Sequence, residues 1–371
     1  MLKKQDIIIT AMFCGFIGIM AVCMAFLPKK TISENEKRSL AEFPAFSVGK
    51  MFKGTWETEF ENYISDHFPA RNLFTAIDSY YMLYTGRNGS KGVYKGEDGY
   101  LLNTPVKCDD EKLCANIQAV NEFAKKTSIK TKLMIVPSAG YVMEDKLPTI
   151  HEQYNDAEII YTKTEKMLES GQMIDLVEEF KRSKDSAQLY YKTDHHWTSE
   201  GAYIAYRLWA AEEGLDVRGK SDYTIETAYD FYGTAYTKSA LWNEKSDKIE
   251  IWEYPANVRV FIENKEYDSM FFREHLNEQD KYPVFLDGNH GFERIINNSN
   301  INGKKILVIK DSYAHAFVPF MAENCSQIDM VDLRYYFDRV SKLAENNVYD
   351  EVLVLYGISS LCEANDLSIL K

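Results

Sequence analysis

The chain has 371 residues, a length that allows one large domain or two smaller ones. Hydrophobic residues make up 45% of it and aromatic residues 13%, which is enough for an extensive core. The formal net charge of -13 argues against nucleic acid as a partner, because nucleic-acid-binding proteins concentrate positive charge on their binding surface.

The first thirty residues contain an uncharged run from Ile7 to Leu27. A run of about 20 apolar residues spans the hydrocarbon core of a bilayer. Two lysines lie on either side of it, so loop charge does not fix its orientation. A cleaved signal peptide is the competing interpretation, but the run is long for one and no small-x-small site follows it. We therefore expect residues 1–30 to be an uncleaved, single-pass anchor in the cell membrane, with the rest of the chain outside the cytoplasm.

Residues 31–80 indicate a stalk and a helical arm. The segment "TISENEKRSLAEFPAF" is polar with scattered apolar positions, and Pro44 breaks any helix there. The following segment, "WETEFENYISDHFPARNLFTAIDSYYMLY", has apolar residues at helical spacing and is interrupted at Pro69.

Residues 81–371 read as one domain of the α/β class, which carries the candidate site residues taken up below. The stretch "GVYKGEDGYLL" predicts a hairpin with a tight turn at Asp98-Gly99. Amphipathic helical patterns then alternate with short apolar strands such as "KTKLMIVPS", "AQLYYKT" and "KKILVIK". This alternation predicts a parallel sheet with helices on both faces. Residues 216–300 break the rhythm with "KIEIWEY" and "VRVFIENK", which alternate like antiparallel strands, so we expect a small β-rich insertion there.

Four cysteines lie outside the expected anchor. Cys108 and Cys114 bracket the sequence "DDEKL" and could close a small loop in an oxidising compartment. Unpaired thiols are an equally open interpretation.

A group of titratable residues follows the expected strand "QLYY". Asp194 and His196 are two positions apart, and in an extended segment such residues point the same way. We expect the carboxylate and the imidazole to share one face of the chain. His195 then points away and braces the loop, while Trp197 acts as a hydrophobic lock before the helix that begins in "TSEG".

A second candidate site follows the apolar strand "ILVI". Ser312 lies in the turn "KDS", at the carboxyl end of a strand and the amino end of a helix, where ligands bind in open α/β sheets. Ser312 could be a simple N-cap. A serine nucleophile, however, needs a base oriented by a third group, and Asp194 and His196 supply both. Asp311 is a supporting residue in the turn, and His315 either faces the site or packs; it ranks below His196 as the base.

Together, "TDHHW" and "IKDSYAHAF" make the chain resemble the DHHW family of bacterial proteins, which is related to SGNH-hydrolase-like acetyltransferases of the alginate O-acetylation type. The resemblance covers most of the chain, including "SENEKRSLAEFP", "FENYISDHFPARN" and "FYGTAYTKS". It implies an SGNH-like three-layer fold with permuted motif order, since the serine block comes after the Asp-His block. One departure is Lys310, where related hydrolases more often have glycine before Asp-Ser.

The resemblance also implies a membrane-anchored O-acetyltransferase acting on a surface polysaccharide. Ser312 would be the nucleophile, His196 the base and Asp194 the orienting acid. A membrane-bound O-acyltransferase partner would deliver the acetyl donor, and no cofactor is expected. The candidate oxyanion donors are the backbone N–H groups of Ser312, Gly233 and Tyr313. The aromatic residues that could stack on the sugar are Trp197, Tyr236 and Trp242.

Three alternatives stay open. Water in place of a sugar hydroxyl would make the enzyme a polysaccharide acetylesterase. A non-catalytic polysaccharide-binding scaffold of an export complex would need no intact site. A metal-dependent hydrolase would use ligands from Asp194, His195, His196, Asp311 and His315, but these residues lack a standard ligand spacing, so we expect no metal.

Overall fold

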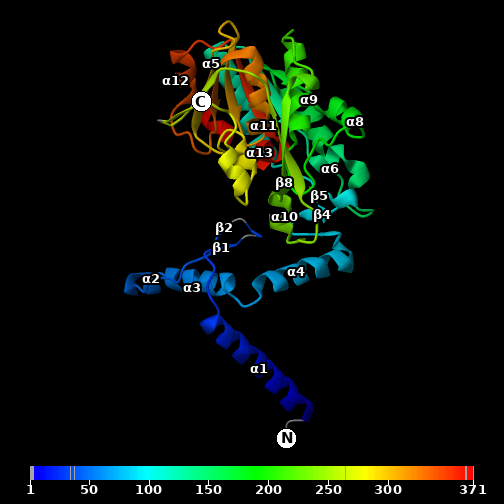
Figure 1. Cartoon of the computed structure of the whole chain (residues 1–371), viewed down its shortest axis with the longest axis vertical. Coiled ribbons are helices and arrows are strands. Elements are labelled where there is room, and N and C mark those ends of the chain that lie inside the picture. Colours follow the sequence, from blue (N-terminus) through cyan, green and yellow to red (C-terminus); the bar gives the residue numbers. More distant parts are fainter. Residues whose placement is uncertain (1–3, 34, 37, 264, 364–365, 371) are drawn as a thin grey trace. The chain divides into compact units, whose positions relative to one another are not determined.

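The computed structural model describes residues 4–33, 35–36, 38–263, 265–363 and 366–370 (Figure 1). The chain forms two compact units. The N-terminal unit comprises residues 1–91 with 237–242. The other unit comprises residues 92–236 with 243–371; it holds the residues that the sequence predicts to be catalytic and is called the catalytic unit below. The boundaries expected from the sequence, at residues 30 and 80, stay predictions.

The N-terminal unit begins with a long apolar helix, α1 (Lys4–Phe26). Its mean hydropathy is 2.5 over 18 residues and none of that window is buried, so the helix is long and apolar enough to cross a membrane. The elements that follow are β1 (Ile32–Ser33), β2 (Arg38–Ser39), α2 (Val48–Phe52), α3 (Thr55–Asp66), α4 (Arg71–Met82), the turn η1 (Leu83–Arg87) and β3 (Gly89–Ser90). As the sequence indicates, the helical pattern is interrupted between α3 and α4, near Pro69.

The catalytic unit is built on an eight-stranded sheet in the order β11-β10-β12-β14-β13-β15-β6-β7. Its strands are β6 (Thr131–Val136), β7 (Gln172–Ile174), β10 (Val258–Ile262), β11 (Lys265–Tyr267), β12 (Phe292–Asn297), β13 (Lys304–Lys310), β14 (Cys325–Val331) and β15 (Glu351–Gly357). The pairs from β14 to β7 are parallel, and β12, β10 and β11 continue the sheet in antiparallel pairing. The sheet is therefore mostly parallel, with an antiparallel edge.

Both faces of this sheet are covered, because its central strands are apolar on both sides. One hydrophobic core joins the sheet to α5 (Asp110–Thr127), α12 (Val340–Asn346) and α13 (Ile358–Glu363). The other joins it to α9 (Ser199–Glu212) and α11 (Ala314–Met321). The predicted three-layer α/β fold, with helices on both faces of the sheet, is confirmed.

The remaining elements are smaller. They are β4 (Val93–Lys95), β5 (Leu101–Asn103), α6 (Ala139–Val142), α7 (Glu165–Met167), α8 (Val177–Ser183), β8 (Thr224–Phe231), α10 (Thr234–Ser239), β9 (Asp247–Glu253) and the short turn η7 (Tyr282–Val284). Strands β8 and β9 pair only with each other, whereas β10, β11 and β12 join the main sheet. Residues 216–300 thus contribute both a separate ribbon and the antiparallel edge, and their origin as an insertion stays a prediction.

The six cysteines are free thiols. Cys108 and Cys114 do not close a loop: the Cys114 Sγ on α5 lies 3.8 Å from the Met167 Sδ, and the Cys108 thiol hydrogen-bonds to that of Cys362.

Candidate active site

The segment that carries Asp194 and His196 is a tight loop, not the strand that the sequence predicts. The only ladder contact described for it is a single bridge between Tyr190 and Trp197. The Asp247 carboxylate holds the loop from outside: it accepts hydrogen bonds from the N–H of Lys192 at 2.9 Å and from the N–H and hydroxyl of Thr193 at 2.7 and 2.6 Å. These bonds to a side chain far along the sequence replace the backbone ladder of a regular strand.

This loop brings Asp194 and His196 into direct contact. The Asp194 Oδ1 lies 2.5 Å from the His196 Nδ1 and also accepts the His196 backbone N–H at 2.9 Å. The other ring nitrogen, Nε2, lies 2.7 Å from the Ser312 Oγ. Asp194 and His196 are buried, while Ser312 is half-buried. Three residues that the sequence separates by up to 118 positions therefore form one hydrogen-bonded chain that ends at a serine open to solvent.

The second oxygen of Asp194 is also fully engaged. Its Oδ2 accepts the Thr234 N–H at 2.6 Å and the Thr234 hydroxyl at 2.9 Å. Burial by itself raises the pKa of the Asp194 carboxyl, but the imidazoles of His196 and His195 and the Thr234 N–H outweigh burial and hold the pKa well below its usual range. Asp194 is therefore an anion at neutral pH. An anion beside Nδ1–H leaves Nε2 as the lone-pair acceptor for the serine proton.

Ser312 is presented by a short turn after β13. The Asp311 carboxylate braces this turn by accepting the N–H of Tyr313 at 3.0 Å and the N–H of Gly357, at the end of β15, at 2.8 Å. The N-cap of α11 is Tyr313 and not Ser312, so the simple capping role does not account for the serine hydroxyl. Among the described residues, the Ser312 N–H has no hydrogen-bond partner within the protein. It is the best-placed candidate for an oxyanion donor.

The two other candidate oxyanion donors are already engaged. The Gly233 N–H donates to the Thr193 Oγ1 at 3.1 Å, and the Tyr313 N–H donates to Asp311. Gly233 instead allows close packing: a Cβ at this position would lie 2.1 Å from the Asp194 Cβ. The Tyr313 hydroxyl donates to the His195 carbonyl at 2.7 Å, which ties the serine turn to the histidine loop.

Of the aromatic residues expected to contact a sugar, Trp197 is fully buried and donates its Nε1–H to the Tyr313 carbonyl at 3.0 Å. Its ring is closed to a sugar, and it has the locking role that the sequence also suggested. Tyr236 is half-buried, with its ring 4.4 Å from that of Tyr232. Trp242 belongs to the N-terminal unit, and a sugar contact there stays a prediction.

The two remaining histidines near the site differ. The His195 side chain is 33% exposed, and its Nδ1 lies 2.6 Å from the Thr234 Oγ1. His315 is buried on α11, with its Nε2 2.5 Å from the Lys310 Nζ. Burial lowers the pKa of His315 well below its usual range, and the Lys310 amine lowers it further. His315 is therefore a neutral acceptor for Lys310 and not the base beside Ser312.

A residue that the sequence did not single out completes the site. The Tyr282 ring stacks on the His196 imidazole with 3.9 Å between centroids and 12° between planes. Its hydroxyl donates to the Ser312 carbonyl at 3.3 Å. Tyr282 therefore contacts both the candidate base and the candidate nucleophile. It comes from η7 in the 216–300 stretch, and no motif in the sequence marks it.

The structure also bears on the metal alternative. Within the described residues, the ligand atoms of Asp194, His195 and His196 lie within 4.8 Å of one another. Both ring nitrogens of His196 are already hydrogen-bonded, so a metal ion would have to replace one of the bonds to Asp194 or Ser312.

Comparison with known proteins finds a matching family model, similar curated proteins and solved structures with the same fold. A family model described as "DHHW protein" matches residues 108–331. Two curated proteins, both named probable alginate O-acetylase AlgJ, are similar to the chain. The protein from Pseudomonas syringae pv. tomato is 24% identical over 207 residues, or 51% of this chain and 48% of its own length. The protein from Pseudomonas fluorescens is 25% identical over 204 residues, or 51% and 49%. The chain thus spans about half the length of these relatives.

Two solved structures share the fold. A DHHW family protein from Eubacterium siraeum superposes with a TM-score of 0.65 at 24% identity, covering 73% of this chain and 92% of that chain. PatB1 from Bacillus cereus, solved with a sulfonyl adduct, superposes with a TM-score of 0.62 at 20% identity, covering 75% and 98%. The family model accounts for more than half of the 371 residues. The chain therefore belongs to the DHHW protein family.

Proposed function

We propose that this protein is a serine O-acetyltransferase that acts on a polysaccharide. The observation that carries the proposal is the unbroken hydrogen-bonded chain from Asp194 through His196 to the half-buried Ser312 hydroxyl. This arrangement is the one that activates a serine for acyl transfer. The names of the AlgJ relatives, which describe alginate O-acetylases, support an acetyl group and a polysaccharide acceptor.

The first half of the reaction forms an acetyl-serine. The His196 Nε2 takes the Ser312 proton as the Oγ attacks the acetyl carbonyl, and the imidazolium then gives that proton to the departing group of the donor. The Ser312 N–H donates to the oxyanion, a contribution that is worth roughly 10²–10³ in rate for one donor in other enzymes. Anionic Asp194 stabilises the imidazolium, because it accepts the Nδ1–H throughout.

The second half transfers the acetyl group to the acceptor. A sugar hydroxyl loses its proton to Nε2 and attacks the acetyl-serine, and the proton returns to the Ser312 Oγ when the ester bond breaks. If water takes the place of the sugar, the product is acetate and the enzyme is an esterase. The acceptor must therefore occupy the position of the attacking water.

The apolar N-terminal helix supports a proposal for the location of the enzyme. We propose that α1 anchors the chain in the cell membrane and that the catalytic unit lies outside the cytoplasm. Acetyl-CoA is cytoplasmic, so a membrane-bound O-acyltransferase partner would supply the acetyl group across the membrane. These roles belong to the proposal together with the acetyl chemistry.

The test compares full-length Ser312→Ala with the wild type, using a chromogenic acetate ester as donor. We expect kcat/KM to fall by about 10³-fold or more, because loss of a nucleophile removes the whole acyl-enzyme route. A sulfonyl fluoride should label the wild type but not the variant. Ser186→Ala, a change at an exposed serine, is the matched control and should keep full activity.

Further arms separate the alternatives. Acetyl transfer to an added oligosaccharide in preference to water supports the transferase, whereas acetate alone supports the esterase. Unchanged hydrolysis by Ser312→Ala would exclude the serine mechanism. Loss of activity with a chelator would favour the metal site, and glycan binding with no turnover would favour a scaffold.

A further inference from the structure

Helix α4 and the turn η1 that follows it carry a stripe of apolar side chains that are exposed in the described part of the chain. Leu73, Ile77, Tyr81 and Tyr84 follow one another at intervals of four, four and three positions, which places them on one face of a helix. Their exposed fractions are 59%, 54%, 64% and 80%. In a water-soluble helix this face would be turned inward. Phe74 widens the stripe and is 40% exposed.

A second exposed apolar group surrounds α2. Val48, Met51 and Phe52 are 59%, 53% and 90% exposed. Phe43 and Phe46, just before this helix, are 64% and 67% exposed, although each has one ring edge against α3. The apolar surface of the N-terminal unit is therefore large and extends over two helical segments. Surfaces of this kind mark an interaction site.

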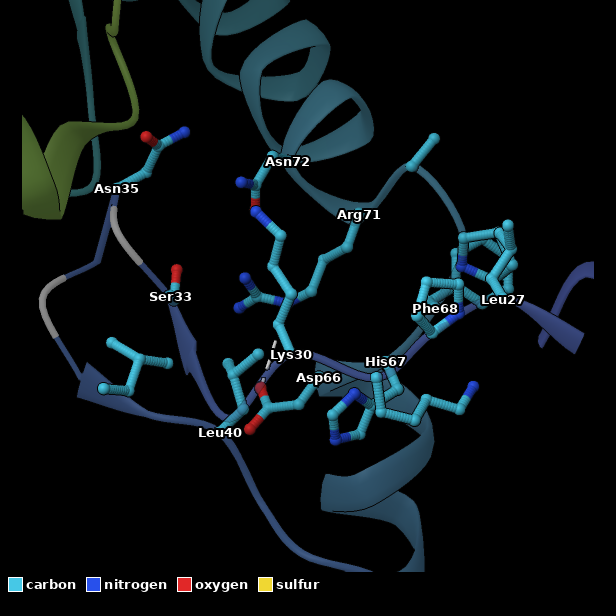
Figure 2. Close-up of a pocket in the computed structure, with 15 residues that line it drawn as sticks. Leu27, Lys30, Ser33, Asn35, Leu40, Asp66, His67, Phe68, Arg71 and Asn72 are labelled. Carbon is cyan, nitrogen blue, oxygen red and sulfur yellow. Dashed lines mark ion pairs between the residues drawn. The ribbon is translucent and has the colours of Figure 1, made fainter. Parts of the chain in front are cut away.

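The residues that directly follow α1 lie beside the corner between α3 and α4 in the N-terminal unit. A pocket of about 270 Å³ is lined by residues 27–30, directly after α1, and by residues 66–72 at the corner between α3 and α4 (Figure 2). Ion pairs hold this corner: Arg38 and Arg71 both contact Asp66, and the Arg71 guanidinium lies 2.8 Å from the Glu36 carboxylate. The first residues of α4, just before Leu73, thus lie beside the residues that follow the apolar helix α1.

We propose that the exposed apolar faces of α2 and α4 lie in the surface of the membrane that α1 crosses. The inference rests on the proposed anchoring by α1 and adds a second contact with the same bilayer. The partner is the lipid boundary between headgroups and acyl chains, where Tyr, Phe and Leu of interfacial helices insert. Lys29 and Lys30, between α1 and the corner, match the phosphates of that layer.

The test uses photocrosslinking of the full chain in its native membrane. A photoreactive residue is placed on the stripe by Ile77→p-benzoylphenylalanine or Tyr81→p-benzoylphenylalanine. The matched control is Asn72→p-benzoylphenylalanine, which is exposed on the same helix and lies on the face opposite Ile77 and Tyr81. These positions are on the surface, so each variant should keep the wild-type proteolysis pattern. After irradiation, mass spectrometry identifies what each position captured.

We expect lipid adducts at positions 77 and 81 that are at least about fivefold more abundant than at position 72. Equal yields at the three positions, no lipid adduct, or capture of residues 92–371 or of another polypeptide would overturn the proposal. Extraction of the wild-type chain from membranes by alkaline carbonate would overturn the anchoring by α1 as well. Retention of the chain without stripe-specific adducts would overturn only the surface contact, so the two failures are distinguishable.

Discussion

At the scale of single residues, the candidate site depends on a loop that uses each Asp194 oxygen twice. Oδ1 accepts from the ring and the backbone of His196, and Oδ2 accepts from the backbone and the hydroxyl of Thr234. A carboxylate with four donors has no freedom to rotate, and it fixes the imidazole plane with it. The sequence correctly predicts that Asp194 and His196 meet, but the cause is this loop and not the geometry of a strand.

Tyr282 offers a test of how the imidazole is positioned. Its ring lies flat on His196, and its hydroxyl reaches the Ser312 carbonyl. We expect Tyr282→Phe to keep kcat within about threefold, because the stacked ring remains. Tyr282→Leu should lower kcat by about 10–10²-fold with little change in KM, because a small displacement of a catalytic group is costly. Steady-state kinetics with a chromogenic acetate ester measures both values.

The control for this prediction is Tyr229→Leu, at a tyrosine that is 67% exposed on β8. It should leave kcat and KM unchanged. Equal losses for Tyr282→Phe and Tyr282→Leu would assign the effect to the hydroxyl contact instead of the stacked ring. Full activity in both variants would show that Tyr282 has no part in positioning His196.

At the scale of elements, the turn between β8 and α10 packs closely against the candidate acid, Asp194. Gly233 lies so close to Asp194 that an added Cβ would be 2.1 Å from the Asp194 Cβ and 2.4 Å from its Oδ2. We expect Gly233→Ala to push the carboxylate away from His196 and to lower kcat by about 10-fold or more while the fold is kept. Activity is measured by ester hydrolysis, and the fold by circular dichroism.

Gly219→Ala is the matched control for the glycine change. The nearest atoms to a Cβ at Gly219 lie 3.6 and 3.7 Å away, which is ordinary contact. This variant should behave as the wild type. If Gly233→Ala is fully active, the turn does not hold Asp194 in place and the position of the acid is set by the histidine loop alone.

The elements differ in how well the sequence predicts them, for physical reasons. The apolar strand before Ser312 and the Asp98-Gly99 hairpin are local patterns, and both are confirmed: β13 is buried along its length from Ile306 to Lys310, and β4 pairs with β5. The predicted strand "AQLYYKT" is wrong: at its end, the distant Asp247 carboxylate takes the N–H groups of Lys192 and Thr193. A contact made across 55 positions leaves no local pattern in the sequence.

The same reason explains the missed residue. Tyr282 reaches His196 from 86 positions further along the chain, and its neighbours carry no motif. The position of Trp197 before a helix predicts that its ring packs in the core. Its complete burial, with the indole N–H donating to the Tyr313 carbonyl, depends on α11 and the serine turn, which the local sequence does not reveal. Residue types predict the candidate chemistry, whereas tertiary contacts decide which aromatic rings lie beside the candidate site.

At the scale of the whole molecule, the chain combines a mostly parallel sheet that assembles the site with a separate N-terminal unit that carries the apolar helix. Ser312 follows β13, in the middle of the sheet, and the histidine loop precedes α9, which packs on the same face as α11. The carboxyl ends of parallel strands are where such folds bind ligands. The side of the membrane on which the catalytic unit lies depends on the whole chain, and labelling of the cysteines can test it.

Cys114 is a natural reporter of that sidedness. Among the six free cysteines, Cys14 and Cys23 lie in α1, Cys325 and Cys362 are buried, Cys108 is half-buried, and Cys114 is exposed on α5 of the catalytic unit. If the catalytic unit lies outside the cytoplasm, a membrane-impermeant maleimide should label Cys114 in intact spheroplasts, and Cys114→Ser should remove this labelling. Peptide mass spectrometry identifies the modified thiol. Labelling of Cys114 only after the membrane is broken would place the catalytic unit in the cytoplasm, where no transmembrane delivery of the acetyl group is needed.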